Sequence, residues 1–241
     1  MNRVTDKTWL VLATAAALLC ALSAMGAAKD TASPAGAPVF SPDKGKLSIR
    51  LNGQKIGSEQ FELMPSGNAW LAKGTTELNV PGGAAPTRVS GALLLQPDGA
   101  PISYEWSSHA DKTNGAHIVF TNGVAKITLE MQGARPFEQD LSFNAPLIAV
   151  LDNNLYDQYA LLARVYDWSK RGPQTFPVLV PQDLTPGTIT VEATGDSSVD
   201  GKSYEGLRVT TADLQVLLLV DSNHRLMRLE VPSAKVSVIR E

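Results

Sequence analysis

Three side chains near the middle of the chain have the types and spacing of a metal or acid–base site. His109 and His117 flank the segment ADKTNGA, and a hairpin through that segment could set the two imidazoles directly opposite each other. Glu105 precedes His109 on the same predicted strand face. A metal site needs three or four convergent ligands with a supporting shell. We therefore favour a partly solvated polar pair here, and we predict neither a metal nor a cofactor.

Other catalytic signatures are missing from the sequence. There is no Gly-x-Ser-x-Gly elbow, no phosphate-binding loop and no dinucleotide fingerprint after a strand. The carboxylates are scattered over strand and turn positions, with no pattern that pairs them in a dry cleft. We assign no catalytic residue and predict a non-enzymatic role. A hydrolase or metal enzyme using His109 and His117 is the last alternative.

The N-terminus has the three-part plan of a secretory signal peptide. Arg3 and Lys7 form a basic head, Trp9 to Leu22 form an apolar run, and small residues follow. Cleavage after Gly26 or after Ala28 satisfies the small-residue rule. We predict a signal peptide over residues 1–28, with a retained N-terminal anchor as the alternative.

The same segment predicts that the protein is exported without a lipid anchor. Cys20 is the single cysteine of the chain, and Leu19 precedes it where a lipoprotein signal needs a small residue. We predict a periplasmic or extracellular protein that is not lipid-anchored and has no transmembrane span after signal cleavage. Removal of the signal would leave no thiol, which excludes disulfides and zinc–cysteine sites.

Charge and composition narrow the possible partners. The 241 residues carry 21 basic and 24 acidic side chains, for a net charge of −3, and neither sign forms a block. Nucleic-acid binding requires a clustered Lys/Arg face, so we predict no nucleic-acid partner. Residues 29–45 are rich in Ala, Pro, Ser and Gly and are predicted to be a flexible tether. A single β-rich domain is expected over residues 46–241.

The pattern after the tether is that of short strands separated by turns. Asn52-Gly53, Asn114-Gly115 and Asn122-Gly123 are type I′ hairpin signals, because both central residues of that turn need φ > 0. One segment changes to helical spacing, and we predict a helix over residues 153–169 that Asp152 or Asn153 caps. The fold class is therefore mainly β: a single strongly curved antiparallel sheet, an open or half barrel of about 11–14 strands, with one main helix on its concave face.

Glycine spacing supports the curvature. A two-residue turn at Asn52-Gly53 places Ile49 opposite Ile56, but strict alternation from there would expose Phe61. An extra residue near Gly57 restores the pattern, so we predict a bulge there. Gly206 follows the turn glycine Gly201 at a similar interval and suggests a second such site. Bulges bend strands, which a curved sheet requires.

Two predicted strands, ALLLQ and LQVLLLV, are apolar on both faces. One face can pack on the sheet core, and the other would then meet the helix, a partner or a lipophilic molecule. We predict an exported, non-enzymatic protein that binds a lipid or other hydrophobic small molecule, such as an acyl chain, between sheet and helix. The alternative is an envelope module for interaction with another envelope protein, with a fully packed core. The candidate cavity lining is Leu94, Tyr156, Tyr159, Leu162, Tyr166, Leu217 and Leu219.

Two motifs carry a resemblance to known families. The early hairpin LNGQKIGSEQFEL and the ending LLLVDSNHRLMRLEVPSAKVSVIRE resemble uncharacterised exported bacterial families of unknown function. Those families begin with a G-x-x-x-G hairpin and end on a strand, an Asp turn and a strand. More distantly, the chain from Lys46 to Glu241 looks like the half-barrel of the outer-membrane lipoprotein carriers. That resemblance implies a curved antiparallel sheet lidded by helices around a hydrophobic cavity.

Overall fold

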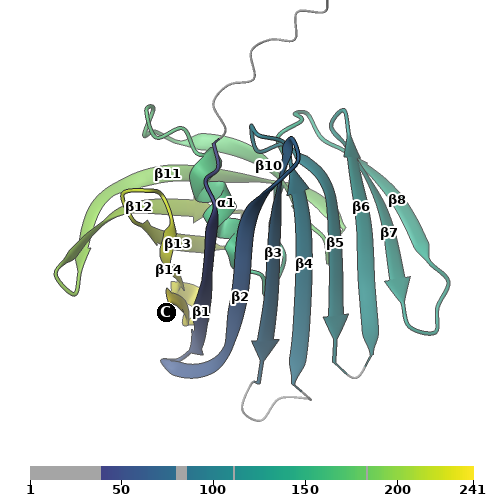
Figure 1. Ribbon diagram of the computed structural model, residues 1–241, viewed down its shortest axis with the longest axis horizontal. Coiled ribbons are helices and arrows are strands. Elements are labelled where there is room, and N and C mark those ends of the chain that lie inside the picture. Colours follow the sequence, from purple (N-terminus) through teal and green to yellow (C-terminus); the bar gives the residue numbers. More distant parts are fainter. Residues whose placement is uncertain (1–38, 80–85, 111, 183) are drawn as a thin grey trace, which may run out of the picture. The chain divides into compact units, whose positions relative to one another are not determined.

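The computed structural model describes residues 39–79, 86–110, 112–182 and 184–241. The predicted signal peptide and residues 29–38 of the predicted tether lie outside these ranges. One sheet of 15 strands runs in the order β8-β7-β6-β5-β4-β3-β2-β1-β15-β14-β13-β12-β11-β10-β9 (Figure 1). The elements are β1 (Asp43–Leu51), β2 (Gln54–Ser66), β3 (Ala69–Leu78), β4 (Thr87–Leu95), β5 (Pro101–His109), β6 (Thr113–Thr121), β7 (Val124–Met131), β8 (Phe137–Ser142), β9 (Ala149–Val150), α1 (Asp157–Val165), β10 (Gln174–Val180), β11 (Thr185–Val199), β12 (Lys202–Thr210), β13 (Gln215–Val220), β14 (Leu226–Val231), the 3-10 turn η1 (Pro232–Ala234) and β15 (Val236–Arg240).

The sheet is mainly antiparallel and open, as predicted. The first strand, β1, lies at its centre and pairs with the last strand, β15. The chain fills one side from β1 to β8, passes through β9 and α1, and returns from β10 to β15 on the other side. Within the described ranges β8 and β9 are the two edges, and no pairing closes them into a barrel. Figure 1 shows β10 to β13 crossing behind β1 to β8, with α1 between the two sets.

The domain begins earlier than the sequence pattern indicates. Phe40 is buried, and β1 starts at Asp43, within the stretch predicted to be tether. Asp43 is itself buried because it pairs with two arginines far along the chain. No helix within the described ranges has the length and apolar character needed to cross a membrane.

The glycine predictions for the first hairpin are confirmed. Asn52 and Gly53 have φ of 51° and 80°, as a type I′ turn requires. The β1–β2 register shifts after Ile49, which lies opposite Gly57, while Ile56 is the extra residue. A Cβ at Gly57 would be 2.2 Å from the Glu77 carbonyl oxygen, so only glycine fits there. The predicted pairing of Ile49 with Ile56 is therefore wrong by one residue.

The second glycine site, at Gly206, also lies beside a bulge, and it is in the other half of the sheet, between β11 and β12. The β11–β12 register shifts between Ala193 and Gly195, with Gly206 opposite Gly195. The bulge thus lies in β11, and a Cβ at Gly206 would be 2.2 Å from Thr194 Oγ1. Both bulges lie in long strands, β2 and β11, and a bulge bends the strand that carries it.

One predicted turn is wrong. Asn114-Gly115 lies inside β6, where Asn114 pairs with Ser108 and with Met131. The hairpin closes earlier, at the pair of His109 with Thr113. An Asn-Gly pair is compatible with a strand when both neighbouring strands satisfy its backbone groups.

The helix is shorter than predicted, and its cap is different. It covers Asp157–Val165 rather than residues 153–169, because Asn154 has φ of 101° and Tyr166 is extended. The predicted caps, Asp152 and Asn153, precede it, and its N-cap residue Tyr156 makes no side-chain cap. The amides at its start bind a carboxylate from the sheet instead.

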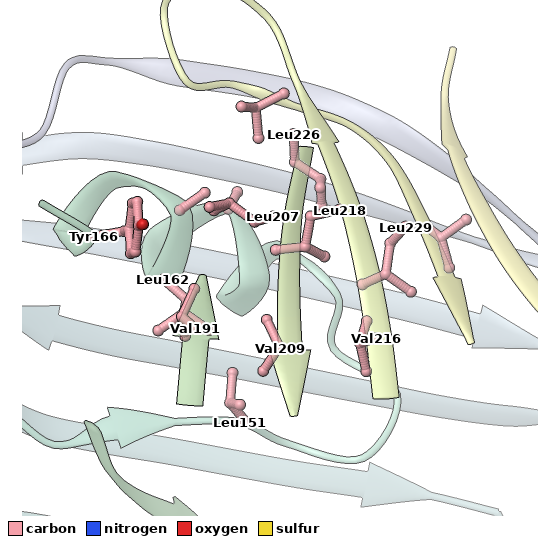
Figure 2. Packing of buried hydrophobic residues seen from close by; sticks show 14 of the residues in the cluster. Leu151, Leu162, Tyr166, Val191, Leu207, Val209, Val216, Leu218, Leu226 and Leu229 are labelled. Carbon is pink, nitrogen blue, oxygen red and sulfur yellow. The ribbon is translucent and has the colours of Figure 1, made fainter. Parts of the chain in front are cut away.

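The buried apolar side chains form two clusters, and α1 contributes to both. Leu162 and Ala163 pack with strands of the β10–β15 side, whereas Leu161 packs with β4 and β5. Figure 2 shows Leu162 of α1, and Tyr166 just after it, beside buried side chains of β11 and β12. The helix therefore fills the concave side of the curved sheet, as predicted.

Candidate functional site

Four of the predicted cavity residues come together around the helix. Leu162 and Tyr166 are almost fully buried in the first cluster, and Tyr156 and Tyr159 pack against that cluster with part of their surface exposed. The Tyr166 hydroxyl donates to the Gly172 carbonyl oxygen at 2.9 Å. The same hydroxyl accepts from the backbone amide of Ala193 in β11 at 3.1 Å, which ties Tyr166 to the sheet.

The other three predicted residues lie on the opposite face of the sheet. Leu218 is fully buried on the helix side, so its neighbours Leu217 and Leu219 point outward and are half-buried. Leu94 alternates in the same way between two buried leucines of β4. The two-faced apolar strands thus have one leucine set in the core and one set outside.

Long charged side chains accompany the outer leucines. Leu217 pairs in register with Arg208 and Glu230, and Leu219 pairs with Arg228. Arg208 also binds Glu192 at 2.7 Å. The aliphatic stems of such side chains can cover apolar surface while their charged ends stay in water. This explains the outer leucines without a bound molecule.

The space between α1 and the sheet is nearly filled. A cavity of about 20 Å³ lies beside the helix, with room for about one water molecule. Pockets for small organic ligands are typically ~300–1,000 Å³. The residues around this cavity include Leu93, Leu95, Leu161, Leu162 and Val165.

A buried glutamate from the sheet holds the start of the helix. Glu59 of β2 accepts hydrogen bonds from the backbone amides of Tyr156 at 2.7 Å and Asp157 at 2.8 Å. The Thr76 hydroxyl donates to the same carboxylate at 3.2 Å. A carboxylate suits this place because the first amides of a helix are unsatisfied and its N-terminus carries partial positive charge. Sequence analysis missed Glu59, although its alternation with Phe61 and Leu63 places it on the inward face.

Glu59 and Asp157 form a buried carboxyl pair. Burial raises the pKa of Glu59 well above its usual range, and the charge of Asp157 raises it further. Burial also raises the pKa of Asp157 to about 6. Burial and the repulsion from Asp157 therefore both favour the protonated form of Glu59. Gly74 makes room for the pair, since a Cβ there would be 2.7 Å from Asp157 Oδ1.

A second polar contact fixes the segment before the helix. The Tyr104 hydroxyl of β5 donates to Asp152 Oδ2 at 2.7 Å, and Gln182 Nε2 donates to Asp152 Oδ1. Gln158 of the helix accepts from the Asp152 backbone amide. Burial raises the pKa of Asp152 to about 6, against the lowering effect of the bonds from Tyr104 and Gln182. The predicted cap residue therefore anchors the loop to the sheet.

A third contact holds the end of the helix. Arg164 Nη2 lies 2.9 Å from Asp43 Oδ2, and Arg240 Nη2 lies 2.6 Å from Asp43 Oδ1. Asp43 and Arg164 are both buried. The Arg240 guanidinium also lies over the Phe61 ring, 5.2 Å from its centre. One aspartate near the start of the domain thus binds the helix and the last strand together.

The three metal candidates lie on the outer face of the sheet. Glu105 is directly opposite His117, with 3.8 Å between Glu105 Oε1 and His117 Nδ1, and both side chains are largely exposed. His109 is opposite Thr113, so the two histidines do not face each other as the hairpin prediction required. Within the described ranges, no three His, Cys, Asp or Glu side chains come together as a metal site. Glu105 and His117 instead form an exposed cross-strand polar pair.

Burial raises the pKa of the interior carboxyls Glu59, Asp152 and Asp157, and these groups lie where the helix docks on the sheet. Glu59 and Asp157 are buried, and the groups that Glu59 binds belong to the helix start and to β3. An acid–base role would need access for a substrate. The geometry instead gives three polar attachments, at Glu59, Asp152 and Asp43, around a packed apolar core.

Comparison with known proteins identifies the fold. No family model matches the chain, and no curated protein matches it. A crystal structure of a beta-barrel-like protein of the domain of unknown function DUF1849 from Brucella abortus has a TM-score of 0.56 and 10% sequence identity, covering 84% of this chain and 95% of that one. A DUF1089 family protein from Pseudomonas aeruginosa has a TM-score of 0.45 and 10% identity, covering 73% of this chain and 90% of that one. The fold of this chain is therefore similar to that of the beta-barrel-like DUF1849 domain.

Proposed function

We propose that this protein is an exported, non-enzymatic module that acts through its surface on a partner in the cell envelope, with the helix as part of a packed core. The single observation that carries the proposal is the filled space between α1 and the sheet, where a cavity of about 20 Å³ remains. An acyl chain could enter only if the helix moved. Such movement would break the attachments at Glu59, Asp152 and Asp43.

Export is supported by the first 28 residues. A basic head, an apolar run and small residues in sequence are the marks of a secretory signal peptide. Fractionation of cells that express the full chain tests this part, together with the mass of the processed protein. Cleavage after Gly26 leaves Ala27 first, and cleavage after Ala28 leaves Lys29 first. A protein of full-length mass in the membrane fraction would contradict export with signal removal.

A lipid test separates the surface proposal from the lipophilic-ligand hypothesis. The mature protein is purified without detergent and examined by native mass spectrometry, and an organic extract is analysed for lipids. We expect the mass of the polypeptide alone. A lipid bound at one molecule per chain, and lost on replacing Leu162 by Asp at the centre of the core, would support the ligand hypothesis and overturn ours.

A crosslinking test addresses the partner. A photoreactive amino acid is placed at Lys73 or Glu105 on the outer face, or at Asn223 in the β13–β14 turn, and cells are irradiated. All three positions are exposed, so each tolerates the replacement. We expect an adduct from the outer-face positions and none from Asn223. Equal adducts from all three positions, or none from any, would contradict a specific partner surface.

A further inference from the structure

The outer face of the sheet carries a row of small and hydroxyl-bearing side chains at the same height on five strands. Gln60 of β2 pairs with Thr75 of β3, which pairs in turn with Ser90 of β4. Ser107 of β5 and Gly115 of β6 continue the row. We call these five residues the outer trough floor. Paired residues of neighbouring strands share one face, so their side chains form one continuous strip.

This strip lies in a hollow. An open depression of about 940 Å³ is lined by residues of β3 to β7, and another of about 670 Å³ by residues of β1 to β3. The two share Lys73, Gly74 and Thr75 in their linings, so they adjoin each other on the outer face. Together they form the outer trough. Each depression by itself has a volume in the range of ligand sites, unlike the cavity beside the helix.

Two glycines lie directly behind the outer trough floor, on the inner face of the sheet. Gly74 and Gly91 are paired neighbours on the inner face, where they have no side chain. A Cβ at Gly91 would be 2.6 Å from Leu155 Cδ1, so the segment before the helix packs directly on the backbone. On the outer side the floor residues are short. The backbone that carries the trough floor is therefore the same backbone on which the helix segment docks.

The charges around the trough balance. Its lining includes three lysines, Lys44, Lys46 and Lys73, and three glutamates, Glu62, Glu105 and Glu130. One of these glutamates has a partner across a strand pair, since His117 lies 3.8 Å from Glu105. Beside the trough, Arg88 lies 3.0 Å from Glu77. An anionic or cationic polymer would gain little from such a surface.

The side chains of the outer trough floor can hydrogen-bond to the hydroxyl groups of a ligand. Serine and threonine hydroxyls both donate and accept hydrogen bonds, and Gln60 does the same through its amide. The backbone groups of the floor are already bonded within the sheet, so an extended peptide cannot join it as an added strand. The row reaches from Lys46 in β1 to Glu130 in β7, and six spacings of ~4.8 Å make it roughly 29 Å long. A ligand that uses this length is a linear oligomer.

We propose that the outer trough binds a neutral, hydroxyl-rich linear chain, an oligosaccharide. The inference rests on the proposed function, because it names the partner class for a domain that works through its surface. The affinity should be modest. The trough lining also includes Trp106 and Phe61, but both side chains pack on the inner face with the buried apolar clusters, so neither ring is offered for stacking.

Titration calorimetry of the mature protein with maltohexaose, cellohexaose and chitohexaose tests the proposal. We expect at least one of these neutral hexasaccharides to bind with a millimolar or lower Kd. Ser90→Lys and Ser107→Lys, which fill the floor, should each weaken that binding at least tenfold. Thr121→Lys lies on the outer face outside the trough and should leave binding unchanged. Circular dichroism checks that each variant is folded, and the second floor variant serves if the first does not fold.

Three results would overturn the oligosaccharide proposal. They are no heat from any hexasaccharide at millimolar concentration, binding that both floor variants retain, and binding of an uncharged Ser/Thr/Gly peptide in place of the sugars. These outcomes are separate from those of the lipid test. A lipid-bound core with a sugar-binding trough would refute the proposed function alone, and an empty core with an inert trough would refute this inference alone.

Discussion

The inner and outer faces of the strands around the helix differ in packing and exposure, although they share one backbone. On the inner face Glu59, Gly74 and Gly91 serve the helix, and their surroundings are dry and tightly packed. On the outer face, one residue away along each strand, Thr75 and Ser90 lie in an open depression. Strand alternation lets one segment carry a rigid core and an accessible surface at once. Mutations on the two faces should therefore lower the unfolding free energy by very different amounts.

The largest effect is expected from the buried ion pairs. Asp43→Ala removes the carboxylate that binds both Arg164 and Arg240, and it leaves a buried guanidinium without its counter-charge. Breaking a buried pair in this way costs about 3–5 kcal/mol of unfolding free energy. Urea denaturation measures it. Glu241→Ala, which removes an exposed pair with Lys55, is the control and should cost about 0–1 kcal/mol.

The next comparison uses adjacent leucines on opposite faces. Leu218→Ala opens a void in the core and should cost about 2–5 kcal/mol. Leu217→Ala removes a half-buried outer side chain and should cost about 1 kcal/mol. Thermal and urea unfolding of the two variants measure the difference. Equal losses would mean that the outer leucines are also buried, against a partner or a second copy.

A smaller effect on stability is expected at Gly91, where the segment before the helix packs directly on the sheet backbone. Gly91→Ala forces a methyl group against Leu155 and the Tyr104 hydroxyl, which should cost about 1–3 kcal/mol. Ser90→Ala, the neighbouring outer-face substitution, should change stability by about 0.5 kcal/mol or less. The two variants are compared by their denaturant midpoints. A harmless Gly91→Ala would show that the segment before the helix can withdraw from the sheet.

The smallest expected effect is on pH dependence. The pKa of Asp152 is raised from 3.8 to about 6, so the folded protein keeps a proton that the unfolded chain has released. Stability from this group is complete below the unfolded value of 3.8 and is lost as the pH rises through about 6. Glu59 and Asp157 act in the same direction. We expect Asp152 alone to lower the unfolding free energy by about 1–2 kcal/mol from pH 5 to pH 8.

Asp152→Asn provides the control for that measurement. The amide keeps an oxygen for the Tyr104 hydroxyl but cannot ionise. The variant should show a flatter stability profile between pH 5 and pH 8 than the natural sequence. A profile that rises with pH in the natural protein would contradict the raised pKa values of these carboxyls.

Local features were the ones that the sequence predicted well. The turns at Asn52-Gly53 and Asn122-Gly123 and the bulge near Gly57 depend on residues close together in the chain, and the structure confirms them. Asn114-Gly115 failed because the same dipeptide can sit in a strand when both neighbours pair with it. The helix was found, but its ends depend on contacts with the sheet rather than on its own capping residues.

The attachments that define the interior could not be predicted, because they join distant residues. Glu59 lies 98 positions from the amide that it binds at Asp157. Asp43 lies 121 positions from Arg164 and was assigned to the tether for lack of a visible partner. Apolar runs such as LLLV gave no indication of which leucines face the helix, so Leu217 and Leu219 were grouped with Leu162.

The central place of β1 has a consequence for the order of assembly. The sheet is continuous only where the first strand meets the last, and Asp43 binds Arg240 across 197 positions of chain. That seam cannot form until β15 has been synthesised, and closing so long a loop is slow. The two halves of the sheet stay unjoined until then. The complete sheet therefore becomes available only after every strand from β1 to β15 has left the ribosome.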